Sequence, residues 1–215
     1  MSKLICLMGE SGSGKTTALR NLPPAETCYI DADGKGLSWK GWKNSFAEAK
    51  QNYLRSTDPI LILKTMNWID SNPEAKKFKY IVIDTLNSIM VADEMRRSKE
   101  KGYDKWVDLA QSVYTIVTHS NELRDDLTVI LLAHTQTDTE DDGYRFIHLK
   151  TNGKKLNKIC LESFMTTVLL ARKSGEKYIL ETTANHSSAK SPMGAFTNNE
   201  IDNDIMPVLE ALKEY

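Results

Sequence analysis

Residues 9–16 read GESGSGKT and directly follow the apolar run LICLM at residues 4–8. The spacing G-x-x-x-x-G-K-[ST] after such a run is typical of a loop that joins a buried strand to a helix and binds phosphate groups. The alternative is a glycine-rich turn that contains a lysine by chance. Because the fixed positions, the apolar run and the following helical segment all agree, we expect the loop to bind ATP together with Mg²⁺.

The residues of this loop suit the chemistry of a triphosphate. Glycine allows positive φ angles and lets backbone amides approach phosphate oxygens closely. Lys15 is expected to neutralise the β- and γ-phosphates, and the Thr16 hydroxyl to join the ligand shell of Mg²⁺ beside the positive end of a helix. The predicted nucleotide-binding residues are Gly9, Glu10, Ser11, Gly12, Ser13, Gly14, Lys15, Thr16 and Thr17.

The length and charge of the chain limit its class. With 215 residues we expect one domain over residues 1–215, with a core at about 3–196 and a tail at 197–215. A formal net charge of -1 leaves no general basic surface, so nucleic-acid binding must come from local patches. The sequence shows no signal-peptide pattern and no apolar stretch of membrane-spanning length, which predicts a cytoplasmic protein without a membrane partner.

The three cysteines are Cys6, Cys28 and Cys160. Each lies in apolar surroundings, and none has C-x-x-C spacing. They are predicted to be buried thiols in a reducing compartment.

Strand and helix signals alternate along the chain. Buried strands are predicted at residues 4–8, 27–31, 80–83 and 127–133. Helix-length segments separate these runs. The alternation predicts an α/β fold with a mostly parallel central sheet and helices on both faces.

Two of these segments carry clear helix signals. Asp58 followed by Pro59 predicts an N-cap and a first helical position, and this helix is expected to stop before Asn72. A longer helix from about Asp104 carries apolar residues at three- and four-residue spacing. Its predicted core residues are Trp106, Leu109, Ala110, Val113, Ile116 and Val117.

The C-terminal third shows weaker patterns. Residues 166–171 and 178–183 predict a C-terminal antiparallel hairpin joined by residues 173–176. Helices are expected at 154–164 and around 208–213. No internal repeat or low-complexity linker is present in the sequence.

The apolar run YIVI at residues 80–83 ends in Asp84. In a nucleotide-binding sheet this position lies beside the phosphate loop, at the carboxyl edge of the strands. Asp84 is therefore expected to hold Mg²⁺ through water. The alternative is a carboxylate that caps the next helix.

The second strand ends in two carboxylates, Asp31 and Asp33, which leave the sheet at the same edge as Lys15. Hydrolysis needs a group near the γ-phosphate that activates or orients water, and Asp33 is the predicted residue. The alternative is that Asp33 initiates the turn at residues 34–36.

The strand at residues 129–133 delivers His134 to this edge. We expect its imidazole to hydrogen-bond the γ-phosphate and to report its loss to the acidic segment 135–143. That segment is expected to be a mobile loop or a ribbon, with a turn at Asp142-Gly143 leading into residues 144–149. The alternative is an ordinary surface or core histidine.

The order GESGSGKT, CYIDAD, YIVIDT and VILLAHTQ resembles the core of the RecA-like recombination ATPases, and more closely the short phage-encoded ones that assist single-strand annealing. The resemblance covers about residues 3–196. It implies a RecA-like P-loop fold, Mg²⁺-dependent ATP hydrolysis, and the host cytoplasm as location if the protein is phage-encoded. It also assigns water activation to Asp33, the sensor to His134, and a cation inserted into a neighbouring subunit to Lys190, in SAKSPMG at residues 188–194.

The resemblance further implies single-stranded DNA as a partner, self-association into a ring or filament, and a single-strand-binding protein. The DNA would lie on two loops at the strand ends, with basic side chains tracking phosphates and Tyr103 or Tyr144 stacking on bases. Acidic residues at 138 and 140–142 count against this, and a charge run is usually a solvated face. The candidate DNA contacts are Arg96, Arg97, Lys99, Lys150, Lys154 and Lys155, with Lys101, Lys105 and Lys158 beside them.

Two other functions stay open. A small-molecule phosphotransferase uses the same loop but normally needs several arginines in a lid over the phosphates, and residues 143–158 offer only Arg145. The second alternative is a binding module that is controlled by nucleotide and hydrolyses little of it. This function fits if Asp33 and His134 are poorly placed for hydrolysis.

Overall fold

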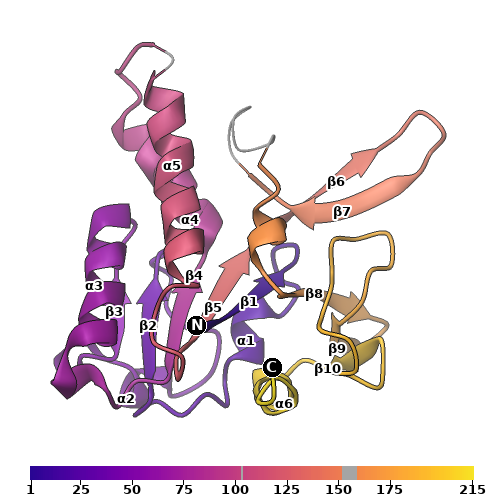
Figure 1. The fold of residues 1–215 in the computed structure, drawn as a ribbon. Coiled ribbons are helices and arrows are strands. Elements are labelled where there is room, and N and C mark those ends of the chain that lie inside the picture. Colours follow the sequence, from indigo (N-terminus) through magenta and orange to yellow (C-terminus); the bar gives the residue numbers. More distant parts are fainter. Residues whose placement is uncertain (103, 152–158) are drawn as a thin grey trace.

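The computed structural model describes residues 1–102, 104–151 and 159–215 (Figure 1). Within them, a mixed eight-stranded sheet has the order β10-β9-β8-β1-β5-β4-β2-β3. Neighbours from β3 to β8 run parallel, whereas β9 and β10 are antiparallel additions at one edge. The strands are β1 (Lys3–Met8), β2 (Thr27–Asp31), β3 (Tyr53–Arg55), β4 (Tyr80–Asp84), β5 (Thr128–Ala133), β8 (Thr167–Ser174), β9 (Lys177–Glu181) and β10 (Glu200–Asp202).

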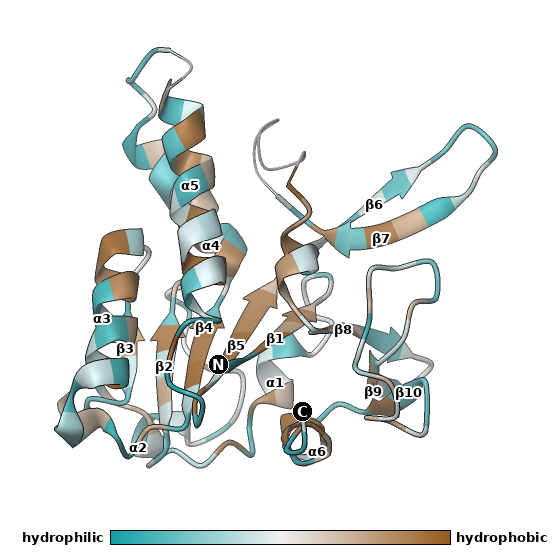
Figure 2. Cartoon of the chain, viewed as in Figure 1, coloured by the Kyte–Doolittle hydropathy of each residue, from teal (hydrophilic) through white to brown (hydrophobic). Residues whose placement is uncertain are grey.

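Helices cover both faces of this sheet, as the sequence predicts. They are α1 (Lys15–Ala18), α2 (Trp42–Ser45), α3 (Pro59–Ser71), α4 (Leu86–Arg96), α5 (Asp104–His119) and α6 (Ile205–Ala211). Short 3₁₀ turns lie at Glu48–Lys50, Pro73–Ala75 and Leu161–Phe164. The central strands are mostly apolar, whereas helices α3, α4 and α5 mix polar and apolar residues (Figure 2).

The two-residue period of the strands divides the core. In β1, Leu4, Cys6 and Met8 pack with α3, α4 and α5, while Ile5 and Leu7 pack with α1 and α6 on the other face. Because central strands bury both faces, they read as continuous apolar runs. This is why the sequence locates β1, β2, β4 and β5 well.

The strand register places the polar residues of the site at one edge. Met8, which precedes the phosphate loop, lies opposite Ala133, which precedes His134. Asp31 is the register partner of Asp84. The ends of four parallel strands therefore meet beside the phosphate loop.

Helix α3 follows its sequence signals closely. The Asp58 carboxylate accepts a 2.9 Å hydrogen bond from the Ile60 amide, Pro59 occupies the first turn, and the helix stops before Asn72. In α5 the predicted core residues from Leu109 to Val117 are buried, but Trp106 is 40% exposed. Trp106 lies in the first turn of α5, and the Nζ of Lys105 lies 5.1 Å from the centre of its ring.

Other predicted elements need correction. The stretch after Asp84 is the regular helix α4 and not a loop. Residues 152–158 lie outside the described residues, so the helix predicted at 154–164 can be compared only at Leu161–Phe164, which is a 3₁₀ turn. The antiparallel hairpin is present, but its loop is shorter than predicted because β8 continues to Ser174 and β9 begins at Lys177. The last helix starts earlier than predicted, at Ile205.

The acidic segment after His134 forms a ribbon. Strands β6 (Thr135–Thr139) and β7 (Arg145–Leu149) pair antiparallel and project from the sheet (Figure 1). Gly143, at φ +85°, allows the predicted turn. Among the described helices, none is long and apolar enough to cross a membrane.

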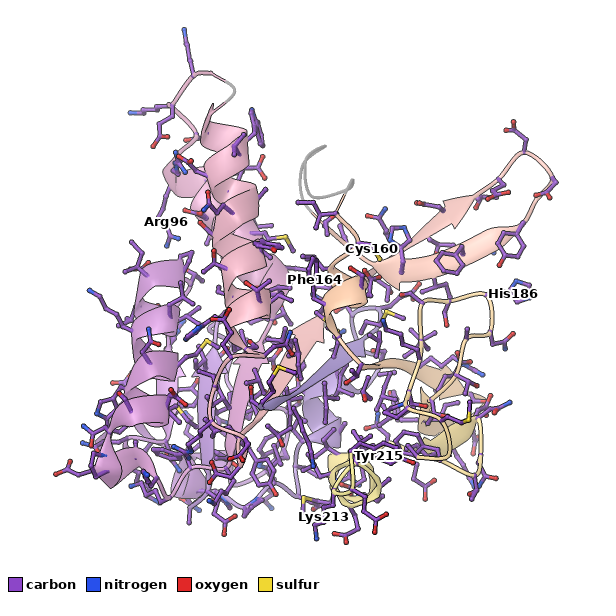
Figure 3. All side chains as sticks on the ribbon, in the orientation of Figure 1. Arg96, Cys160, Phe164, His186, Lys213 and Tyr215 are labelled. Carbon is purple, nitrogen blue, oxygen red and sulfur yellow. The ribbon has the colours of Figure 1, made fainter. Side chains whose placement is uncertain are left out.

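Burial corrects one of the cysteine predictions. Cys6 and Cys28 are buried, as expected, but Cys160 is exposed. It lies just before the 3₁₀ turn that ends at Phe164 (Figure 3). Its neighbours Ile159 and Leu161 pack with the core, whereas Cys160 is exposed and its thiol donates to Glu162 at 3.6 Å.

Candidate nucleotide-binding site

The phosphate loop can be built only with glycine at its key positions. A Cβ atom on Gly9 would lie 2.4 Å from the Ala171 carbonyl oxygen, and Gly12 and Gly14 have φ angles of +78° and +91°. Among the described residues, the Gly12 and Gly14 amides donate no hydrogen bond within the chain. The loop therefore presents free N–H groups, as binding of a phosphate requires.

Lys15 lies folded over this loop. Its ammonium donates hydrogen bonds of 2.7 Å to the carbonyl oxygens of Gly9 and Glu10. Burial lowers the pKa of Lys15 to about 8, with Asp84 acting in the opposite direction. Since α1 is only one turn long, the loop amides and Lys15 supply most of the attraction for an anion.

Thr16 and Asp84 meet across the edge of the sheet. The Thr16 hydroxyl donates to Asp84 Oδ2 at 2.9 Å, and the Tyr29 hydroxyl donates to the same oxygen at 2.6 Å. Asp84 Oδ1 is buried and has no hydrogen-bond partner among the described residues. Burial raises the pKa of Asp84.

This donor set fits a magnesium ion. A buried carboxylate with an unpartnered oxygen offers that oxygen to a ligand, and Mg²⁺ prefers one or two carboxylates, waters and phosphate oxygens. Thr16 and Asp84 are the residues that would hold it. The ion would neutralise negative charge on the phosphates.

The two carboxylates after β2 have separate partners. The Asp31 carboxylate accepts hydrogen bonds from the amides of Gly34 and Gly36 at 2.7 and 2.8 Å. Asp31, and not Asp33, therefore shapes the turn at residues 34–36. Asp33 accepts the Thr85 hydroxyl at 2.9 Å, and it also accepts a hydrogen bond from Ser88 and pairs with Lys35. Burial favours the neutral acid, but these three donors outweigh it and lower the pKa of Asp33.

His134 directly follows β5, which lies between β1, the strand before the phosphate loop, and β4, the strand that ends in Asp84. Its backbone amide donates to Asn87 Oδ1 at 2.7 Å. Burial, and then the charge of Lys15, lower the pKa of His134, which favours a neutral imidazole.

One cavity of about 430 Å³ brings Lys15, Thr16, Asp84 and His134 together, whereas Asp33 is not among its lining residues. It is lined by Ser11, Gly12, Gly14, Lys15, Thr16, Thr17, Lys35, Ser38, Asp84, Thr85, His134 and Tyr178. The remaining loop residues do not line it: the carbonyls of Gly9 and Glu10 hold Lys15, and the Ser13 amide donates to the Glu10 carbonyl at 3.2 Å. Sequence reasoning missed four lining residues that belong to no nucleotide-binding motif: Lys35 in a turn, Ser38 in a loop, Thr85 at the N-cap of α4 and Tyr178 on β9.

Lys190 does not line this cavity. Its backbone pairs with Val168 on β8, and both of its backbone hydrogen bonds to that residue are 2.8 Å long. Within one chain, Lys190 is therefore not placed to act on the nucleotide of that chain.

The candidate DNA contacts are dispersed. Arg96, at the end of α4 (Figure 3), donates to Thr57, and Arg97 pairs with Glu100 and Asp108. Lys99 is exposed. Lys150 is anchored by its backbone to His134 and Asn87, with the residue itself exposed. Lys154, Lys155, Lys158 and Tyr103 lie outside the described residues.

These features define a nucleotide site of the P-loop type in a mostly parallel α/β sheet. A family model described as an AAA domain matches residues 2–192. The chain therefore belongs to the AAA domain family and carries a P-loop ATPase domain. A comparison with curated proteins finds no match.

Proposed function

We propose that this protein hydrolyses ATP with Mg²⁺ at the cavity that contains Lys15, Thr16 and Asp84. The observation that carries the proposal is the 2.9 Å contact between the Thr16 hydroxyl and Asp84. It joins the end of the phosphate loop to the end of β4, which is the pair of groups that P-loop enzymes use for Mg²⁺.

The residues have distinct roles in this reaction. Water attacks the γ-phosphorus, the bond to the β–γ bridging oxygen breaks, and ADP and inorganic phosphate leave. Lys15 and the loop amides hold the phosphates, Asp33 orients the water once its present partners release it, and His134 hydrogen-bonds the γ-phosphate. Lys190 from a neighbouring subunit supplies a further cation.

Phosphate release by purified protein tests this proposal. Wild-type protein should release phosphate from ATP only with Mg²⁺, and Lys15→Ala should abolish release. Lys40→Ala is a suitable control because Lys40 is exposed and lies outside the cavity. Equal turnover in Lys15→Ala and wild type would refute the assigned site.

We also propose that the ATPase is RecA-like and acts on single-stranded DNA. The order of the sequence motifs supports placing the protein among the RecA-like ATPases. The ribbon β6–β7 directly follows His134 and exposes Tyr144 and Phe146. Because their rings can stack on bases, the ribbon supports single-stranded DNA as the partner. Exposed Lys99 and Lys150 can contact phosphates.

Fluorescence anisotropy with a labelled oligonucleotide tests the DNA proposal. Binding should weaken as salt rises, and Phe146→Ala should weaken it, whereas Tyr215→Ala, a change of another exposed aromatic residue, should not. ATP turnover should rise when the oligonucleotide is added. Binding that is undetectable at low salt would contradict the proposal.

A further inference from the structure

The cavity contains a second cation besides Lys15, and no sequence motif points to it. Lys35 lines the same cavity as Lys15, Asp84 and His134. Its ammonium is paired with the Asp33 carboxylate. The Lys35 side chain is 57% exposed, whereas that of Asp33 is only 10% exposed, so the lysine is the freer partner.

The backbone around Lys35 is fixed on both sides. Gly34 and Gly36 have φ angles of +67° and +80°, and their amides are held by Asp31. A Cβ atom on Gly36 would lie 2.6 Å from the ring of Trp42. The amides of residues 32 and 33 donate to the Asp84 carbonyl at 2.7 and 3.1 Å. The turn therefore holds Lys35 at the edge of the cavity, and only its long side chain is free to move.

The charge of Lys35 acts on the other ionisable groups of the site. Its charge contributes to lowering the pKa of Lys15 and of His134, and it opposes the rise in the pKa of Asp84. The charges of Lys15, Lys35, Asp33 and Asp84 cancel formally. A triphosphate with one Mg²⁺ adds net negative charge to this set, and a phosphate oxygen is then a competing partner for the Lys35 ammonium.

We propose that Lys35 exchanges Asp33 for the terminal phosphate of a bound nucleoside triphosphate, and that this exchange frees Asp33 to orient water. The proposal rests on the proposed ATPase function and adds a cation from the same chain. A nucleoside diphosphate lacks the terminal group, so it leaves the Asp33–Lys35 pair intact. Lys35 thus distinguishes ATP from ADP.

Calorimetric titration with a non-hydrolysable ATP analogue and with ADP, both with Mg²⁺, tests the exchange. Lys35→Ala and Lys35→Met should each lower the affinity for the ATP analogue by about tenfold or more. The affinity for ADP should change by less than about threefold, because only the analogue carries the phosphate that Lys35 binds. Lys40→Ala should change neither. Thermal melting of the nucleotide-free variants checks that they fold, and the methionine variant preserves side-chain length. Equal losses for both nucleotides, or no loss, would overturn the proposal.

A second variant separates exchange from simple charge repulsion. Asp33→Asn keeps an oxygen that can accept from Thr85 and Ser88 but removes the charge that holds Lys35. It should bind the analogue more tightly, by a few fold, and should lose turnover. In the Lys35→Met background the same change should no longer tighten binding, because no ammonium is left to release. Equal tightening in both backgrounds would overturn the exchange. If wild-type protein binds neither nucleotide, the ATPase proposal itself fails, which is a different result.

Discussion

Asp31 and Asp33 lie two residues apart, and their partners give them different tasks. Asp31 is buried, and both of its oxygens accept hydrogen bonds: Oδ1 from the Gly34 amide, and Oδ2 from the Gly36 amide and the Tyr53 hydroxyl. Asp33 accepts only side-chain donors. One carboxylate therefore shapes the turn, and the other contacts Thr85 and Lys35, which line the nucleotide cavity.

Stability measurements can separate these tasks. Asp31→Asn replaces one acceptor oxygen by a donor, so a buried amide loses its partner and the unfolding free energy should fall by about 1–3 kcal/mol. Asp33→Asn keeps an acceptor and should change stability much less. Urea unfolding followed by circular dichroism measures both. A larger loss for Asp33→Asn would contradict this division.

The three thiols should react very differently. Burial raises the pKa of Cys28 to about 12 and that of Cys6 still further. Burial, followed by the charge of Glu162, raises the pKa of exposed Cys160 above the ordinary value of a thiol. Because the thiolate is the reactive form, alkylation of Cys160 should be slow at pH 7 and should accelerate as the pH rises toward and past 9.

Mass spectrometry of iodoacetamide-treated protein checks this. Native protein should be labelled at Cys160 alone, and Cys6 and Cys28 should become labelled only after unfolding. Cys160→Ser should leave native protein unlabelled. Rapid labelling of Cys6 in folded protein would show that β1 is less buried than it is here.

At the scale of elements, Asn87 joins the ribbon to the nucleotide site. This buried side chain, in the first turn of α4, accepts the His134 amide at 2.7 Å and donates to the Lys150 carbonyl at 2.8 Å. The Lys150 amide closes the arrangement by donating to the His134 carbonyl at 2.8 Å. Both ends of the ribbon are thus tied to the helix that follows Asp84.

Removing this side chain should loosen the ribbon. Asn87→Ala leaves the His134 amide and the Lys150 carbonyl without their partner, which should cost about 1–3 kcal/mol. Hydrogen exchange should become faster for the β6 and β7 amides than for those of β1. Asn67→Ala, on the exposed face of α3, is the matched control. Unchanged exchange in the ribbon would mean that pairing within the ribbon alone holds it.

The elements that sequence reasoning missed share a physical cause. β3 and β10 are three-residue strands near the sheet edges, too short and too exposed to show a two-residue period. Helix α4 carries Asn87 among its buried residues and has no continuous apolar stripe. The central strands and α3 are predictable because burial and capping leave local patterns.

The same reasoning applies to the site. Lys15, Thr16, Asp84 and His134 stand at strand ends or in a motif, so the sequence alone brings them together. Lys35 does not, because a lysine between two glycines reads as an ordinary turn. Its place in the cavity depends on the hydrogen bonds of Asp31, which no spacing rule reveals.

For the whole molecule, ligand binding should raise stability. The site joins loops from four strands of the sheet, so Mg²⁺ and ATP that bind only the folded state stabilise it by mass action, by about 2.7 kcal/mol at a ligand concentration of 100 Kd. Thermal unfolding should shift upward with a non-hydrolysable ATP analogue and Mg²⁺. Chelation of Mg²⁺ should reduce the shift, and Lys15→Ala should abolish it. An equal shift in Lys15→Ala would place the nucleotide elsewhere.

The place of Lys190 makes a prediction about assembly. Lys190 does not line the nucleotide cavity of its own chain, and its structural contacts are backbone hydrogen bonds to Val168, so Lys190→Ala should fold normally. If Lys190 acts on a neighbouring subunit, turnover per subunit should rise with protein concentration and should be lost in Lys190→Ala.

Mixing two inactive variants distinguishes action between subunits from action within one. Lys15→Ala keeps Lys190 but cannot hold the phosphates, whereas Lys190→Ala keeps an intact phosphate loop. A mixture should regain part of the phosphate release, because the first variant supplies Lys190 to the loop of the second. The double variant Lys15→Ala/Lys190→Ala, mixed in the same way, should restore nothing. Two results together would contradict a role for Lys190 between subunits: a rate per subunit that is independent of concentration, and no recovery in the mixture. The second cation of the site would then be Lys35 of the same chain.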